Sequence, residues 1–435
     1  MRKENWTQEQ YAALLREELR PALGCTEPVS IALCAAAMTK ALGCMPERIL
    51  VQCSRNILKN AKGVVVPNSG GMKGIDVAAA LGAIVGAPER GLEVLTGVTP
   101  EQIEAARAWL ARGACQVRLM DTPETLHLVV TGISGDGHTA SAELKRTHTG
   151  LTRVTRDNVA IFHCKTDAEA QEENNAAKSL NVGGILTFAE KARLEENGLR
   201  ELLERQIECN SRIAEEGLSH PYGACVGATL LRHFGESASV RAQAYAAAGS
   251  DARMGGCEMP VVINSGSGNQ GLTASLPVII YARDMGASRE LLYRALLVSN
   301  LVTIHLKTGI GPLSAYCGAT SAGCGAGAGI TYLHGGRYNE IAHTVVNALA
   351  INSGMVCDGA KASCAAKIAS AVEAGLLGMQ MQMHDSEFVG GDGIVLKGVE
   401  NTIRNVSKMA HDGMAETDRE IIRLMIAPQE GAASC

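Results

Sequence analysis

The amino-acid sequence predicts an α+β protein in which a β-rich α/β domain is inserted into a mostly helical domain. The hydrophobic period indicates this, because short β-forming runs separated by turn signals fill about residues 46–167, and helical spacing dominates from residue 168 onward. The length of 435 residues allows two or three domains. We expect residues 1–45 plus 168–435 to form the helical domain and residues 46–167 to form the inserted one.

The N-terminal part of the helical domain is predicted to contain two helices. Glu9–Leu19 has helical periodicity and runs into Pro21. The sequence GCTEP at residues 24–28 then interrupts the pattern. Val29–Ala41 predicts a tightly packed helix with Pro28 near its first turn, where proline is tolerated.

The inserted segment predicts a meander of strands with helices on one face. Ile49, Val51 and Cys53 alternate as in a strand. Further runs rich in β-formers are Cys115–Met120, Leu126–Ile133, Thr139–Arg146, Leu151–Thr155 and Val159–Cys164. Two helices, Val77–Val85 and Pro100–Arg112, are expected to pack on this sheet.

Apolar residues recur at helical spacing in six segments after residue 167. These segments are Leu199–Glu216, Ser288–Leu306, Arg337–Asn352, Ala362–Met383, Gly398–Met414 and Glu416–Ile426. Glycine-rich stretches are expected to join helices, and they are Val66–Gly74, Ser250–Gly271, Ser314–Ile330 and Phe388–Val395. Glycine lets backbone N–H groups converge on an anion. The sequence SGNQG at residues 267–271 therefore indicates either a cradle for a carboxylate or phosphate, or a tight turn between packed helices.

Composition and charge exclude several classes of function. The net charge is −5 and there is no basic tract, so we expect no nucleic-acid partner. The apolar runs are too short to span a bilayer, and the N-terminal segment has no apolar signal run, so we expect a cytoplasmic protein without membrane contact. Its fourteen cysteines would then be reduced thiols rather than a disulfide framework.

A few cysteines could carry chemistry. Cys25 directly precedes a predicted helix, where the macrodipole and free N–H groups favour the thiolate, although a small buried residue in a turn fits as well. Cys317, Cys357 and Cys364 lie in or beside glycine-containing stretches next to helices, which can supply convergent metal ligands. Cys324 fits packing in an Ala/Gly segment. The spacing matches no common compact zinc or ferredoxin pattern, so metal binding and packing both stay open.

The motifs taken together resemble those of a known family. They are PALGCTEPVSIAL, VPNSGGMKG, SDARMGG, NSGSGNQG and SGMVCDGAKASCAAK. In this order they resemble the L-cysteine desulfidase family, which is related to the alpha chain of the iron–sulfur L-serine dehydratases. The resemblance runs from about Pro21 to Ile426, and the β-rich middle region carries little of it.

The resemblance implies a carbon–sulfur lyase that converts L-cysteine to pyruvate, ammonia and sulfide with a 4Fe-4S cluster and without pyridoxal phosphate. The cluster would leave one iron open, and the ligand positions that match the family are Cys317, Cys357 and Cys364. Cys25 matches the catalytic cysteine and is our candidate for the base. The candidates for binding the substrate carboxylate are Arg253, Ser267, Asn269 and Gln270. The expected partner is a small amino-acid substrate, and we also expect a homo-oligomer, namely a dimer.

Three alternatives remain beside this interpretation. The same machinery could dehydrate L-serine. A pyridoxal-phosphate lyase is disfavoured, because SGNQG resembles its carboxylate loop but no lysine lies between Lys191 and Lys307 to form the Schiff base. The chain could instead be a zinc or thiol sensor, or an amino-acid-binding module.

The chain ends in EGAASC, a small-residue tail with Cys435 as its last residue. One hypothesis is that this tail folds back and caps the open iron when no substrate is bound. The alternative is a tail whose terminal thiol has no role.

Overall fold

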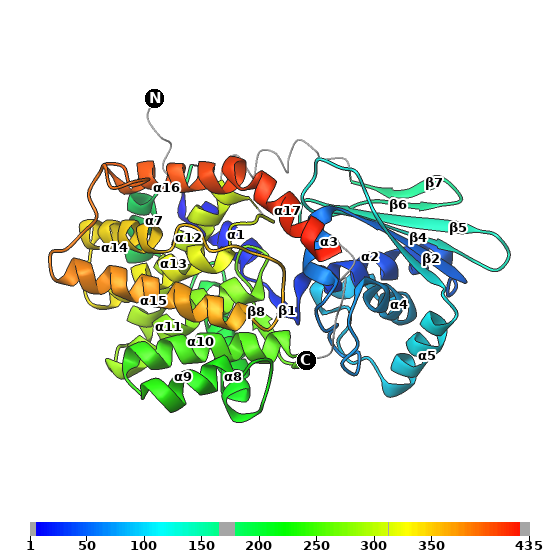
Figure 1. Cartoon of the computed structure of the whole chain (residues 1–435), viewed down its shortest axis with the longest axis horizontal. Helices are drawn as coiled ribbons and strands as arrows, with labels where there is room; N and C mark the ends of the chain where they lie inside the picture. Colours follow the sequence, from blue (N-terminus) through cyan, green and yellow to red (C-terminus); the bar gives the residue numbers. More distant parts are fainter. Residues whose placement is uncertain (1–5, 165–178, 312, 427–435) are drawn as a thin grey trace.

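In the computed structural model, residues 6–164, 179–311 and 313–426 are described. Figure 1 shows a sheet with helices on one face, beside a larger group of packed helices. The predicted α+β class is confirmed. The proposed division into domains of residues 1–45 plus 168–435 and residues 46–167 stays a prediction.

The described chain is built from strands and helices in the following order. The strands are β1 (Pro21–Leu23), β2 (Arg48–Cys53), β3 (Cys115–Leu119), β4 (His127–Ile133), β5 (Thr139–Lys145), β6 (Leu151–Arg156), β7 (Val159–His163) and β8 (Pro260–Val262). The helices up to β3 are α1 (Gln8–Glu18), α2 (Thr26–Leu42), α3 (Arg55–Ala61), α4 (Ile75–Val85), the 3-10 helix η1 (Pro88–Glu93) and α5 (Pro100–Ala111). The later helices are α7 (Val182–Lys191), α8 (Leu199–Ser219), α9 (Val226–Phe234), α10 (Ala238–Met254), α11 (Gly268–Asp284), α12 (Arg289–Ile310), α13 (Gly318–Leu333), α14 (Tyr338–Ile351), α15 (Cys364–Met383), α16 (Val399–Lys408), the short π-helix η2 (Met409–Gly413) and α17 (Ala415–Ile426).

The large sheet has the strand order β3-β2-β4-β5-β6-β7. Only β2 and β3 pair in parallel, and the other neighbours are antiparallel. In β5, buried residues alternate with partly exposed ones along the whole strand, as expected for a sheet with one covered face. A separate antiparallel pair, β1 with β8, joins the N-terminal segment to the helical part.

Helix α2 covers this sheet and is almost entirely buried. It packs against β4, β5 and β6 on one side and α4 on the other, and Figure 1 shows α2 and α4 along the sheet. The crossing with α4 is close, because a Cβ atom at Gly82 would lie 2.2 Å from the carbonyl oxygen of Ala32. Helix α1, in contrast, contacts α8 and α12. This packing favours a start of the inserted part before α2 rather than at residue 46.

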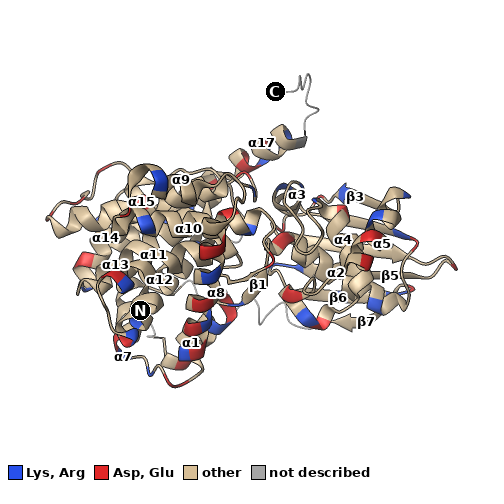
Figure 2. Ribbon diagram, turned by 90° about the horizontal axis from the view of Figure 1, so that it is seen from below, with Lys and Arg blue, Asp and Glu red and all other residues tan. Residues whose placement is uncertain are grey.

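Helix α13 lies at the centre of the helical part. All its residues from Ala319 to Leu333 are buried, and it contacts α11, α12, α14 and α15. The expectation that the glycine-rich stretch Ser314–Ile330 joins helices is therefore wrong for most of its length. Glycine weakens an isolated helix, but here it permits close packing on every side. Figure 2 shows the contrast between this uncharged centre and the charged residues on α1 and α8.

The contact between α13 and α15 is made by small residues. A Cβ atom at Gly323 would lie 2.1 Å from the carbonyl oxygen of Ala371, and one at Gly327 would lie 2.6 Å from that of Gly375. Moving four residues along α13 thus moves the contact four residues along α15, so the two helices run parallel. Their N-terminal ends consequently lie side by side.

None of the helices in the described ranges is long and apolar enough to cross a membrane.

The glycine contact provides a test of the packing. Gly323→Ala forces α13 away from α15, since the new methyl group meets backbone rather than a movable side chain. We expect the free energy of unfolding to fall by about 1–3 kcal/mol, as for other overpacked cores. Urea denaturation measures this. Gly183→Ala in α7 is the control, because its methyl group would make only ordinary contacts of 3.5 Å or more. Equal stability of the two variants would contradict the close approach.

Candidate active site

Cys317 and Cys357 are brought together by a short antiparallel bridge between Tyr316 and Val356. The backbone N–H of Cys317 donates to the carbonyl of Met355 at 2.9 Å, and that of Cys357 donates to the carbonyl of Ala315 at 2.6 Å. The two thiols are hydrogen-bonded to each other. That hydrogen bond raises the pKa of Cys317 and lowers the pKa of Cys357, so Cys357 is the sulfur that ionises more easily.

Cys364 joins this pair because the helices α13 and α15 are parallel. Cys317 is the N-cap of α13, and Cys364 is the first residue of α15. Cys364 interacts electrostatically with both other cysteines, while burial raises its own pKa. Two helix N-termini, whose partial positive charge favours anions, thus point at one group of thiols.

Three lysines surround the thiols. Lys59 donates from Nζ to the carbonyl of Cys357 at 3.4 Å, and Lys367 donates to the carbonyl of Val356 at 2.7 Å. Lys307 is buried, which lowers its pKa to about 8, and it lies close enough to Cys357 and Cys317 to interact with their charges. These cations favour negative charge on the sulfurs.

Cys25 lies at the N-cap of α2, as its position before a helix predicted. Its thiol is only 2% exposed and donates to Oε2 of Glu27 at 3.0 Å. Burial and then the charge of Glu27 raise the pKa of Cys25 well above its usual range. The expectation that the helix N-terminus makes Cys25 a thiolate is thus wrong for the protein without ligand, because burial outweighs the macrodipole.

Glu27 is held as a carboxylate by its neighbours. Asn60 donates to its Oε1 at 2.9 Å, Thr26 donates to its Oε2 at 3.2 Å, and Nε2 of His148 lies 3.8 Å from Oε1. Burial raises the pKa of Glu27, but the nearby imidazole of His148 and the thiol of Cys25 outweigh it and lower the net pKa. A buried anion therefore stands next to the Cys25 thiol.

Cys25 lies in a small apolar cluster that Cys364 joins. Val64 and Met254 form a small apolar cluster with Cys25, and Cys364 packs against that cluster. The backbone of Gly359, between Cys357 and Cys364, approaches Lys59 so closely that a Cβ atom there would lie 2.4 Å from its carbonyl oxygen.

Arg253 links GCTEP to SGNQG. Its Nε donates to the carbonyl of Gly24 at 3.0 Å, and its Nη1 donates to Oδ1 of Asn269 at 3.0 Å. Its charge also reaches Cys25. Arg253 is 3% exposed, so its guanidinium is fixed in place rather than free in solvent.

The SGNQG segment forms the first turn of α11, with Ser267 at the N-cap. The side chain of Gln270 lies against Gly318, next to Cys317, where a Cβ atom would be 2.6 Å from Cδ of Gln270. The buried Oε1 of Gln270 has no hydrogen-bond partner in the described structure. All eight residues predicted for the site therefore lie in one region.

Sequence reasoning missed several residues of this region. They are Glu27, Lys59, Asn60, His148 and Lys307. The proximity of Glu27 to Cys25 in GCTEP is a signal that could have identified it. The others come from distant segments, and nothing local marks them. Cys435 lies outside the described residues.

Within residues 6–164, 179–311 and 313–426, no set of three or more His, Cys, Asp and Glu side chains is already arranged to hold a metal ion. The three cysteines provide the right donor type but not a preformed cage. Cysteine sulfurs gathered at helix ends among lysines are nevertheless the donor type that an iron–sulfur cluster requires.

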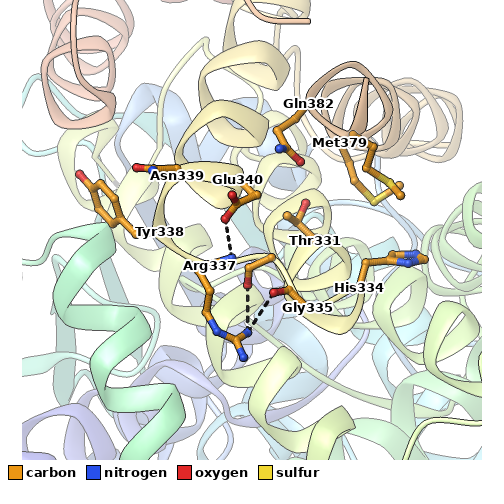
Figure 3. Close-up of a pocket in the computed structure, with 11 residues that line it drawn as sticks. Thr331, His334, Gly335, Arg337, Tyr338, Asn339, Glu340, Met379 and Gln382 are labelled. Atoms are coloured by element: carbon orange, nitrogen blue, oxygen red, sulfur yellow. Dashed lines mark hydrogen bonds between the residues drawn. The ribbon is translucent and has the colours of Figure 1, made fainter. Parts of the chain in front are cut away.

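Two cavities help to locate the site. One of about 420 Å³ is lined by His148, Gly266, Lys307 and other residues of both the sheet and the helical part, and it adjoins the region of Cys25. A larger one of about 560 Å³ lies at the turn between α13 and α14 (Figure 3). There Arg337 bonds to the carbonyls of Gly335 and Gly336, and its backbone N–H bonds to Glu340. None of the predicted site residues lines the larger cavity, so we place the candidate active site at the cysteines.

Comparison with known proteins shows the family of this chain. The family model described as the serine dehydratase alpha chain matches residues 89–423. A UPF0597 protein of Desulfitobacterium hafniense is 49% identical over 416 residues, which cover 96% of each chain. A UPF0597 protein of Lachnoclostridium phytofermentans is 49% identical over 95% of this chain and 98% of its own. One of Treponema denticola is 46% identical over 96% of this chain and 98% of its own.

The ionised Glu27 leads to a pH-dependent stability. Because folding lowers its pKa below the ordinary value of 4.5, the carboxylate stabilises the fold at neutral pH, and this contribution declines as the pH falls through 4.5 toward the lowered value. We expect Glu27→Gln to cost about 1–3 kcal/mol at neutral pH and progressively less in acid. Urea denaturation across pH measures the difference. The exposed control Glu104→Gln should change stability by less than about 0.5 kcal/mol at every pH. A cost at Glu27 that does not vary with pH would contradict its ionised state.

Proposed function

We propose a reaction for this chain from one premise: it belongs to the family of serine dehydratase alpha chains and is a lyase of the dehydratase type. The reaction that we infer is the elimination of sulfide from L-cysteine, which gives pyruvate and ammonia. One observation carries this proposal, namely that three thiols gather at two helix N-termini beside the buried Cys25.

We infer that Cys317, Cys357 and Cys364 hold a 4Fe-4S cluster. Support comes from the donor type, from the hydrogen bond between the first two thiols and from the lysines that balance negative charge. When bound, such a cluster with one open iron supplies a Lewis acid that stabilises sulfur as a leaving group.

The start of α11 would hold the amino acid. Ser267, Asn269 and Gln270 lie where free backbone N–H groups and the positive helix end favour a carboxylate, and Arg253 adds a fixed charge. The unpartnered Oε1 of Gln270 is an acceptor that the substrate ammonium group would satisfy. These contacts would hold the substrate while its α-proton is removed.

Cys25 is the proposed base for the α-proton. Its thiol must first lose its own proton, and the hydrogen-bonded carboxylate of Glu27 is the nearest acceptor. Elimination then gives aminoacrylate, which tautomerises and hydrolyses in water without further help from the protein.

L-Serine is the second candidate substrate, and the description of the matching family favours it. The same contacts would bind its carboxylate and ammonium groups, with a hydroxyl as the leaving group. Parallel assays of pyruvate formation from L-cysteine and L-serine separate the two. The expected homodimer and cytoplasmic location, and the capping role of Cys435, stay predictions.

The ligand set is tested by replacing each cysteine. Cys317→Ala, Cys357→Ala and Cys364→Ala should each lose bound iron and sulfide release, because a cluster short of one thiolate is not retained. The fold should survive, since a chain of this length does not depend on one metal site. Iron and acid-labile sulfide analysis of anaerobically purified protein measures the loss. Cys324→Ala is the control and should keep both, and full iron in any of the three variants would remove that residue from the ligand set.

The role of Cys25 is tested separately. Cys25→Ser should retain the iron content of the unmodified protein and lose turnover by roughly 10²-fold or more, as expected when a general base is removed. Iron analysis and pyruvate formation are measured on the same sample. If the variant lost its iron, Cys25 would be a ligand and not the base.

A further inference from the structure

A buried network of amide side chains lies between α8, α12 and the segment that leads into α11. Its members are Gln206 of α8, Asn300 of α12 and Asn264 between β8 and α11, and all three are fully buried. The proposed reaction uses none of them directly. Apolar side chains of the same shape can often replace paired buried polar groups without loss of stability, so the network requires another explanation. A fully paired buried network fixes one geometry around it.

Asn300 lies at the centre of this network, and its amide uses all four of its hydrogen-bonding positions. Its Oδ1 accepts from Nε2 of Gln206 at 3.0 Å and from Nδ2 of Asn264 at 2.9 Å. Its Nδ2 donates to Oε1 of Gln206 at 2.8 Å and to the carbonyl of Leu296 at 2.9 Å. The backbone carbonyl of Asn300 also accepts from Nδ2 of Asn264 at 3.3 Å. The side chain of Asn264 is thus fixed to α12.

Asn264 begins a tight turn that ends at Ser267, the N-cap of α11. The backbone N–H of each of these two residues donates to the carbonyl of the other at 3.1 Å. Both central residues have a positive φ, +48° at Ser265 and +76° at Gly266, as in a type I′ turn. Glycine adopts such angles readily, but serine does so only at a cost in free energy. The surroundings of Ser265 must therefore hold it in this conformation.

The side chain of Asn264 provides this support. Oγ of Ser265 donates to Oδ1 of Asn264 at 2.9 Å, on the same amide whose Nδ2 donates to Asn300. The turn also reaches the proposed substrate site, because Nε2 of Gln270 donates to the carbonyl of Ser265 at 3.5 Å. The buried Oε1 of that glutamine has no hydrogen-bond partner in the described structure. A chain of hydrogen bonds thus runs from α12 to the acceptor that the substrate ammonium group would meet.

We propose that Asn300 is a positioning residue for the substrate-binding end of α11. By fixing Asn264 it keeps Ser265 in the left-handed conformation. The turn then sets the direction of the first N–H groups of α11 and of the side chain of Gln270. Asn300 acts through the turn and would not touch the substrate. The inference rests on the proposed function for the identity of the ligand, an α-amino acid.

The first measurement follows the turn and does not need turnover. Hydrogen exchange of the full-length protein without substrate is read by mass spectrometry on peptides that cover residues 264–271. Asn300→Leu removes the central amide at similar volume, so the N–H groups of the turn should exchange about tenfold faster or more. Asn347→Leu is the matched control, because Asn347 of α14 is also fully buried and donates to the carbonyls of Gly378 and Ser386. It should leave exchange in residues 264–271 unchanged.

The second measurement uses Ser265, which lies in a partly exposed turn. Ser265→Ala and Ser265→Gly both remove the hydroxyl that bonds to Asn264, but only glycine adopts a positive φ without cost. Ser265→Ala and Asn300→Leu should therefore raise KM for the amino acid about tenfold, with kcat within about threefold and iron content unchanged. Ser265→Gly should keep KM within about threefold of the unmodified protein. Added to Asn300→Leu, it should lower the raised KM again.

Unchanged exchange in Asn300→Leu overturns the proposal, since the network would not hold the turn. An unchanged KM in Ser265→Ala overturns it as well, since the turn would not set the binding of the amino acid. If Asn300→Leu does not fold, the comparison of Ser265→Ala with Ser265→Gly decides the question by the same two measurements. If the unmodified protein forms no pyruvate from either L-cysteine or L-serine, the proposed function fails, while the exchange rates still decide whether Asn300 holds the turn.

Discussion

The candidate active site depends on the close, parallel contact between α13 and α15. Glycines at the contact let backbone meet backbone, so the N-terminal ends of both helices lie at the same level. Cys317 and Cys364 occupy those two ends. The segment before α15 then pairs with the segment before α13 and adds Cys357. A wider separation of α13 and α15 would move Cys317 away from Cys364, because both residues lie at the helix ends themselves.

The site also requires compensation of its negative charges. The carboxylate of Glu27 is buried and the three thiols are half-buried, and removing anions from water is costly unless cations or hydrogen bonds accompany them. Lys59 and Lys307 provide the cations, and both come from helices distant in sequence. Lys59 also pairs with Asp418 of α17, which ties the C-terminal helix to the site.

The site uses both the sheet and the helical part of the molecule. The helical part provides the three thiols, Arg253 and the start of α11, whereas α2 provides Cys25 and Glu27 while packing on the sheet. Two side chains of α2 connect the parts: Thr26 bonds to Gly266 and Ser30 bonds to the turn of His148. The sheet thereby contributes to the geometry around Cys25, although its sequence gave little sign of function.

The sequence by itself determined the α+β class, most helices and strands, and the residues that gather at the site, because periodicity and short motifs are local properties. It did not determine that the glycine-rich stretch beginning at Ser314 is mostly helix, since the gain that offsets glycine comes from contacts with α15. The position of Cys25 before a helix also favoured a thiolate. In the folded protein, burial and the neighbouring Glu27 raise the pKa of Cys25 and so favour the thiol. Sequence reasoning also missed His148, Lys59 and Lys307, because residues distant in the chain place them at the site. Their surroundings are made by segments far away in the chain, and ionisation depends on those surroundings rather than on the residue type.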